Sequence, residues 1–195
     1  MREYFNSKGY MEVETPILPD MKLDESQWDR VQDSIARAED IRKAPASILG
    51  IGARQHELLT MNVLHRAAVS TAAQTRQYQT DYEAVGTQVR TDLGDSLQKA
   101  FQNVPELLDS LGMEDTQANQ RAVRILGYNS LEITEQNITK VKELDAQVNS
   151  VLDHMKPTLV MRLVQQGENP LDLPLDELDQ RLAKLADEQD ISSEE

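Results

Sequence analysis

The sequence predicts an all-α protein, a multi-helix bundle or helical array of about seven to nine helices, with one short extended segment near the N-terminus. Two observations predict this class. The apolar residues are mainly aliphatic, since 39% of the 195 residues are hydrophobic but only 4% are aromatic, and there are few β-branched or aromatic runs to form strands. Apolar residues also recur at steps of three and four after Pro19, which is the period of an amphipathic helix. A chain of this length can bury a sizeable core.

The clearest element is a long amphipathic helix over residues 134–155. Thr134 is a suitable N-cap, because its hydroxyl can accept from free N–H groups of the first turn. Ile133 and Ile138 lie where two apolar side chains staple a helix entry. The apolar stripe that follows consists of Ile138, Val141, Leu144, Val148, Val151 and Met155. We therefore expect this helix to pack against partner helices.

The pattern divides the chain into four parts. Residues 1–22 are a helix–strand segment with its extended part near Met11, residues 23–104 and 105–186 are helical regions, and residues 187–195 are an acidic disordered tail. The region 105–186 is built around the central helix 134–155.

The first helical region begins with a strong start signal. Asp24 can cap a helix and Gln27 can reach back to complete a capping box, while Ala44-Pro45 ends that helix. Residues 46–85 hold one or two further helices. Their expected inward stripe is Leu58, Met61, Leu64, Ala68 and Ala72, and the four-residue spacing of Val89, Leu93, Leu97 and Phe101 suits another helix seam.

The second helical region is punctuated by proline, threonine and glycine. The expected helices run from Pro105 to Gly112, from Thr116 to a stop at Gly127, from Pro157 to Gly167, and from Pro174 to Ala186. An aliphatic residue precedes a helix starter four times, at Leu23-Asp24, Met113-Glu114, Ile133-Thr134 and Leu173-Pro174. Because the spacings are irregular, we interpret this device as shared capping chemistry and not as an internal repeat.

Charge and composition exclude several classes of function. The net charge is −14, and ten acidic against two basic residues lie between Glu168 and Glu195, so nucleic-acid binding is not expected. There is no cysteine for disulfides, thiolate metal sites or thiol catalysis. No apolar run approaches the roughly 20 residues that a membrane span needs. The start also lacks a signal-peptide pattern, so a cytoplasmic location is expected.

Two stretches resemble known families. Residues 1–18 resemble motif 1 of class II aminoacyl-tRNA synthetases of the lysyl type, through Gly9-Tyr10, Val13, Thr15-Pro16 and Leu18. In that family motif 1 is a helix and a strand at the dimer interface. The catalytic motif 2 does not follow, and residues 50–54 lack the acidic residue of motif 3, so the resemblance implies at most a synthetase-derived fragment.

The larger stretch, residues 23–185, resembles a bacterial family of unknown function. The similarity lies in LGDSLQKAF, RAVRILGYN, LEITEQNI and NPLDLPLDEL. The resemblance implies a long helical protein, in some cases in a flagellar hook-length setting, and it brings no catalytic residues.

One tetrapeptide raises the possibility of a serine hydrolase. Residues 94–97 spell the GDSL motif, in which the serine is a nucleophile. That chemistry needs a strand before Ser96 and a histidine base with an aspartate a few residues before it. No strand precedes Gly94, and His154 directly follows Asp153, so a hydrolase is the remote alternative.

Other chemical motifs are incomplete. His56-Glu57 begins like a zinc helix, but Thr60 replaces the second ligand and His65 lies too far along the helix. Residues 50–52 form no phosphate loop. Asp176-Glu177 and Asp187-Glu188 are expected on solvated helix faces, and Asn137 opens a glycosylation sequon without meaning in an unexported chain.

The sequence therefore predicts no catalytic, cofactor-binding or metal-binding residue and no cofactor. The expected function is a non-enzymatic structural or protein-interaction module, which could be a segment of a larger bacterial protein. The expected partner is another protein or a second copy, with no nucleic acid, membrane or small-molecule substrate.

Overall fold

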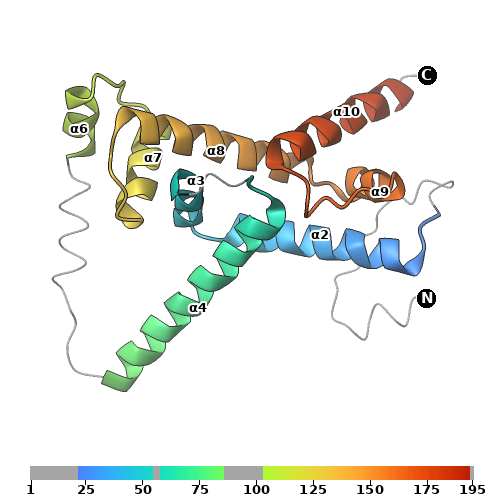
Figure 1. Cartoon of the computed structure of the whole chain (residues 1–195), viewed down its shortest axis with the longest axis horizontal. Coiled ribbons are helices and arrows are strands. Elements are labelled where there is room, and N and C mark those ends of the chain that lie inside the picture. Colours follow the sequence, from blue (N-terminus) through green and yellow to red (C-terminus); the bar gives the residue numbers. More distant parts are fainter. Residues whose placement is uncertain (1–21, 55–57, 86–102, 194–195) are drawn as a thin grey trace.

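The computed structural model describes residues 22–54, 58–85 and 103–193 (Figure 1). Every named element in these ranges is helical, which confirms the all-α prediction. The one pairing of extended chain there is an isolated antiparallel bridge between Thr60 and Pro174. The extended segment expected near Met11 and the stripe from Val89 to Phe101 lie outside the described residues.

The described residues form nine named helical elements, and residues 86–102, between α4 and α6, lie outside the described ranges. The elements are α2 (Glu25–Lys43), the 3-10 helix η1 (Ala46–Gly50), α3 (Ile51–Arg54), α4 (Met61–Val85), α6 (Val104–Ser110), α7 (Gln117–Tyr128), α8 (Glu135–His154), α9 (Pro157–Gln165) and α10 (Leu175–Ser193).

The predicted helix starts are confirmed where capping chemistry is strong. The Asp24 carboxylate accepts from the Gln27 N–H at 2.8 Å, and the Gln27 side chain accepts from the Asp24 N–H at 2.9 Å, which completes the capping box of α2. Thr134 caps α8 by accepting from the Asn137 N–H at 3.2 Å. The predicted stripe of α8, from Ile138 to Met155, is buried throughout.

The end of α7 differs from the prediction. The helix passes through Gly127 to Tyr128, and the residue with positive φ is Ser130, at 52°. The Leu131 N–H donates to the Leu126 carbonyl at 3.0 Å, and the Ser130 N–H donates to the Gly127 carbonyl at 3.0 Å. These two bonds form a Schellman motif, which places the left-handed residue after the helix and not at the glycine inside it.

The region before α4 also differs. Residues 46–54 form two short helical segments, and α4 begins only at Met61, where the Thr60 hydroxyl accepts from the Val63 N–H. Leu58 therefore precedes the helix and is 74% exposed, and Ala72 is exposed because α4 has left the core by that point. Both residues were wrongly expected in the inward stripe, whereas Met61, Leu64 and Ala68 are buried as expected.

The last helix is longer than expected. α10 continues to Ser193, so residues 187–193 are helical, although the sequence predicted a disordered tail from residue 187. The predicted start of α7 at Thr116 is confirmed, because the Thr116 side chain accepts from the Asn119 N–H; Met113-Glu114 lies two residues before this cap.

The described helices form two similar units around the centre of the molecule. Each unit is a long helix, a short helical segment and a second long helix: α2, η1 with α3, and α4 in the first, and α8, α9 and α10 in the second. The two units run in opposite directions, and α4 and α10 leave the centre toward opposite sides (Figure 1). Each short segment packs on the first long helix of the other unit: α9 packs on α2, whereas η1 and α3 pack on α8. The units are thus related by an approximate two-fold axis.

The buried positions of the two units correspond. When the cap Asp24 is aligned with Thr134, the four buried residues of α2 fall on buried residues of α8: Val31 on Val141, Ser34 on Leu144, Ala38 on Val148, and Ile41 on Val151. When Thr60 is aligned with Pro174, Met61, Leu64 and Ala68 of α4 fall on Leu175, Leu178 and Leu182 of α10. The caps Asp24 and Thr134 therefore hold corresponding positions in two similar structural units. The irregular spacings in the sequence did not reveal this relation.

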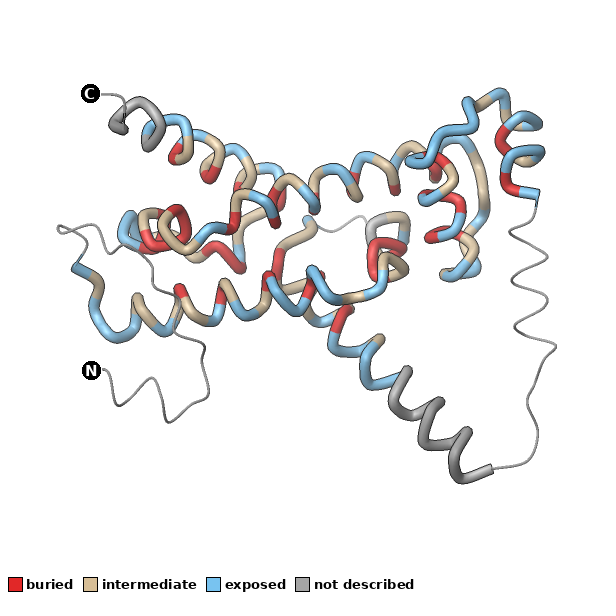
Figure 2. Tube along the Cα trace, turned by 180° about the vertical axis from the view of Figure 1, so that it is seen from behind, coloured by how far each residue is buried: buried red, intermediate tan, exposed pale blue. Residues whose placement is uncertain are grey.

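The two units share one hydrophobic core. Its buried residues come from every long helix and from η1, α6, α7 and α9. In Figure 2 the buried positions lie on the sides of the helices that face one another, while the outer turns of the described part of α4 are exposed. The described residues of regions 23–104 and 105–186 therefore contribute to one hydrophobic core and do not form two independent cores.

Leu144 and its neighbour Glu143 give a direct test of the α8 stripe. Leu144 is buried and Glu143 is exposed. We expect Leu144→Ala to lower the free energy of unfolding by roughly 2–5 kcal/mol, because it removes buried methyl groups and leaves a cavity. Glu143→Ala should change it by no more than about 0.5 kcal/mol. Thermal melts in which the two variants behave alike would contradict the assignment of this stripe to the core.

Candidate functional site

The two units meet at a bridge of extended chain in the centre of the molecule. The Leu175 N–H donates to the Leu59 carbonyl at 2.9 Å, and the Asn62 N–H donates to the Leu171 carbonyl at 3.1 Å. These bonds hold the first turns of α4 and α10 together. Backbone groups at helix starts need such partners, because they have none within their own helix.

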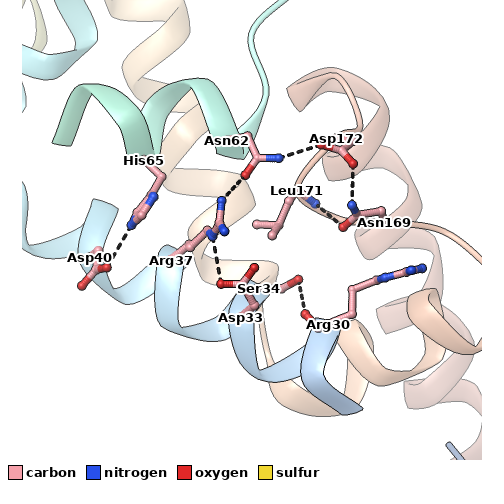
Figure 3. A network of polar contacts seen from close by, with 10 residues as sticks. All are labelled: Arg30, Asp33, Ser34, Arg37, Asp40, Asn62, His65, Asn169, Leu171 and Asp172. Atoms are coloured by element: carbon pink, nitrogen blue, oxygen red, sulfur yellow. Dashed lines mark hydrogen bonds and ion pairs between the residues drawn. The ribbon is translucent and has the colours of Figure 1, made fainter. Parts of the chain in front are cut away.

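A chain of polar side chains surrounds this bridge (Figure 3). Arg37 of α2 donates to the Asn62 side-chain oxygen at 2.5 Å, and the Asn62 amide donates to Asp172 at 2.6 Å. Asn169 also donates to Asp172, and Arg37 pairs with Asp33 at 2.9 Å. Arg37, Asn62 and Asp172 each bind a partner from a neighbouring element, so the network joins α2, α4 and the loop before α10.

An open cleft lies beside the bridge. It has a volume of about 430 Å³ and is lined by Leu59 and by four residues of α8, namely Lys140, Glu143, Leu144 and Gln147. Its lining combines two leucines with one cation, one anion and one amide.

A serine, an aspartate and a histidine meet between α8 and α10. The Ser150 hydroxyl donates to the two Asp179 carboxylate oxygens at 2.8 and 3.0 Å, and His154 Nδ1 lies 3.1 Å from the first of them. In a catalytic triad the histidine stands between serine and aspartate, so that it can take the proton from the hydroxyl. Here the aspartate stands in the middle. The arrangement joins two helices, and the Ser150 hydroxyl donates to the carboxylate and not to the histidine beside it.

The two histidines in the described residues, His65 and His154, contact different aspartates. His154 contacts Asp179, His65 contacts Asp40 of α2 at 3.0 Å, and His56 lies outside the described residues, as do Glu57 and Ser96. Within the described ranges, no three His, Cys, Asp or Glu side chains gather to hold a metal ion.

The acidic pairs and the sequon asparagine also have structural positions. Glu177 pairs with Arg181 one turn later, and Arg181 also contacts Glu168, while Asp187 and Glu188 are exposed. The Asn137 amide donates to the Glu132 carbonyl at 2.8 Å, next to the cap of α8.

The sequence reasoning missed the contacts of Asn129, which joins α7 to η1. Its amide donates to the carbonyls of Ser47 and Ile125, each at 2.8 Å, and its own carbonyl accepts from Arg54. A Cβ added to Gly50 would overlap this amide, so the glycine there is required by close approach. In the sequence, the one indication of these contacts was an asparagine at the end of a predicted helix.

Two polar contacts fix α7 on α8. Arg121 donates to both Asp145 oxygens, at 2.7 and 3.2 Å, and Lys142 donates to the buried Asn119 at 3.1 Å. Hydrogen bonding to Asp145 raises the pKa of Arg121, which stays positively charged. α7 therefore covers α8 through a defined set of partners.

Comparisons with known proteins give one family. Residues 7–195 match DUF6240, a family of unknown function. The chain belongs to this family. No curated protein and no solved structure matches the chain. The match fits the predicted resemblance to a helical family of unknown function, but the DUF6240 description mentions neither flagella nor synthetases. No helix in the part of the chain that the structure describes is long and apolar enough to cross a bilayer.

Proposed function

We propose that this member of DUF6240 is a non-enzymatic helical module that acts through protein contacts, and that two copies associate through the outer half of α4. The proposal rests mainly on one observation, that α4 extends out of the hydrophobic core. Its first turns bury Met61, Leu64 and Ala68, whereas Val69 is 53% exposed and Ala72 and Ala73 are exposed. The helix then continues away from the other elements to Val85 (Figure 1).

A helix that leaves the core gains little stability by itself. Isolated helices are marginal in water, and most helical stability in proteins comes from packing of one face. Val69, Ala72 and Ala73 are three and four positions apart, so they share one side of α4. Small residues there allow a second helix to approach closely.

A second copy is the partner that we propose for this helix. The side formed by Val69, Ala72 and Ala73 can pack on the same side of another α4, and such an isologous contact uses one surface patch on both molecules.

The association is tested by sedimentation velocity across a range of protein concentrations. We expect a concentration-dependent dimer that Val69→Lys abolishes, with stability changed by no more than about 0.5 kcal/mol because the site is exposed. Ser70→Lys is the matched control, because Ser70 is the exposed next residue of the same helix and this substitution adds the same charge as Val69→Lys. A chain that stays monomeric at every concentration, or equal behaviour of the two variants, contradicts the proposal.

The non-enzymatic proposal has its own test. The Ser150 hydroxyl donates to Asp179 and not to a histidine of the described residues, and the GDSL motif at Ser96 lacks the spacing of its histidine. We expect no hydrolysis of p-nitrophenyl acetate above buffer, and no change in Ser96→Ala or Ser150→Ala. Turnover that either substitution abolishes would show that a hydrolase had been overlooked.

The family match also bears on the alternatives. It runs through residues 9–18, where the synthetase-like motif lies, so one family accounts for both stretches. This supports the interaction module over the synthetase fragment. A place as a segment of a larger bacterial protein, and a cytoplasmic location in keeping with the absence of cysteine, complete the proposal.

A further inference from the structure

We propose that the exposed side of α7 binds the acidic end of α10 from a second copy of the chain. The surface on α7, which we call the Tyr128 face, consists of Arg54, Arg124 and Tyr128. It differs from the surface proposed for α4, so either contact can fail while the other holds.

One side of α7 faces solvent along the whole helix. Its exposed residues recur at steps of three and four, which places them on one side: Gln117, Arg121, Arg124 and Tyr128. Tyr128 is 58% exposed and is one of three large hydrophobic side chains that are exposed among the described residues. Exposed tyrosine and arginine are the residue types that carry much of the binding energy at protein interfaces.

This side of α7 is positively charged in a chain whose net charge is −14. Residues 117–131 contain two arginines and no acidic residue. Arg121 pairs with Asp145, whereas Arg124 is exposed and forms no ion pair with a described residue. The charge of Arg124 is therefore available to a partner.

A second cation reaches the Tyr128 face from α3. Arg54 is exposed, and its guanidinium donates to the Asn129 carbonyl. Since Asn129 follows Tyr128, this hydrogen bond holds a positive charge at the end of α7. Two cations beside an exposed ring favour a partner that is acidic.

The end of α10 carries the opposite charge. Leu185 is buried, but Asp187 and Glu188 are exposed, and residues 186–193 include three acidic residues and no basic residue. Acidic side chains are unfavourable near the C-terminus of a helix, because the helix dipole is negative there. Cations from another surface would therefore stabilise this end of α10.

The two surfaces of one chain lie far apart. α7 packs against the first half of α8, whereas α10 runs from the centre toward the opposite end of the molecule, as both views show (Figures 1 and 2). The end of α10 thus cannot close on the Tyr128 face of its own chain, and the contact must join two copies. Because the two surfaces differ, the contact is heterologous and arranges the copies head to tail.

The contact is tested in the Val69→Lys background, which removes the contact proposed for α4. We expect this chain to associate in sedimentation velocity at low ionic strength and to become monomeric at about 0.15 M salt, because salt screens exposed charges. The α4 contact is therefore measured at the higher salt. Arg124→Glu should raise the dissociation constant about tenfold, since attraction becomes like-charge repulsion. Lys140→Glu is the matched control, because it reverses an exposed charge on α8 and should leave association unchanged.

An exchange of charges identifies the two partners. In the same background, Asp187→Lys with Glu188→Lys should weaken association as Arg124→Glu does. A mixture of these two variants should associate again, because the reversed face of one is complementary to the reversed helix end of the other. All three positions are exposed, so circular dichroism should show unchanged helix content.

The remaining outcomes contradict the proposal. A background chain that stays monomeric at low ionic strength lacks the contact. Equal association of the Arg124→Glu and Lys140→Glu chains places the contact on another surface. A mixture that associates no better than its components shows that the end of α10 is not the partner of the Tyr128 face.

Discussion

Leu178→Ala is expected to lower the free energy of unfolding by about 2–5 kcal/mol, the cost of deleting a fully buried leucine and leaving a cavity. Leu178 is 0% exposed in α10, and its counterpart Leu64 is 0% exposed in α4. Because the two leucines hold corresponding positions, Leu64→Ala should cost a similar amount. A total stability of about 5–15 kcal/mol makes either change a large fraction of the whole.

Urea unfolding followed by circular dichroism measures both effects. Lys184→Ala is the control, because Lys184 is exposed on α10 and its loss should change stability by no more than about 0.5 kcal/mol. If Leu178→Ala is strongly destabilising and Leu64→Ala is neutral, the two units do not share one core in the way described.

Gly50→Ala is the second change with a large expected effect. The new methyl group would overlap the Asn129 amide, which is held by Ser47 and Ile125. Forcing a side chain into a packed site costs about 1–3 kcal/mol. Loss of one of the partly buried hydrogen bonds of this amide adds about 1 kcal/mol. We therefore expect a clear fall in the midpoint of thermal unfolding.

A double-mutant cycle isolates this contact. In the background Asn129→Ala the amide is gone, so Gly50→Ala should cost much less than it does in the parent chain. Strictly additive costs would show that Gly50 and Asn129 do not meet, and that the junction of η1 with α7 is not as described.

Local chemistry allowed much of the fold to be predicted. Asp24 and Thr134 mark the starts of their helices, because each accepts a hydrogen bond from a residue three positions later. The buried side of α8 is indicated by apolar residues that recur at steps of three and four. These signals depend on neighbours in sequence, so the order of helices and the long central helix followed from the sequence.

The pairing of distant segments could not be predicted in this way. Asn62 and Asp172 meet only because α4 and α10 begin at the same place, and neither residue carries a local signal of the other. Thr60 and Pro174 start corresponding helices with different chemistry, a hydroxyl cap in one case and a proline in the other. Such differences, with loops of unequal length, hid the two-fold relation.

The central claim is that two interlocked helical units meet at the bridge between Thr60 and Pro174, and a disulfide there tests it most directly. Opposed residues of an antiparallel pair have Cα atoms about 4.5–5.5 Å apart, within the range of a disulfide. The chain has no other cysteine, so Thr60→Cys with Pro174→Cys gives one possible bond within the molecule. We predict that mild oxidation forms it in the monomer and raises the midpoint of thermal unfolding above that of the reduced form, while each single variant forms only links between molecules. Free thiols or exclusively intermolecular links, in a double variant whose circular dichroism remains helical, would contradict the account.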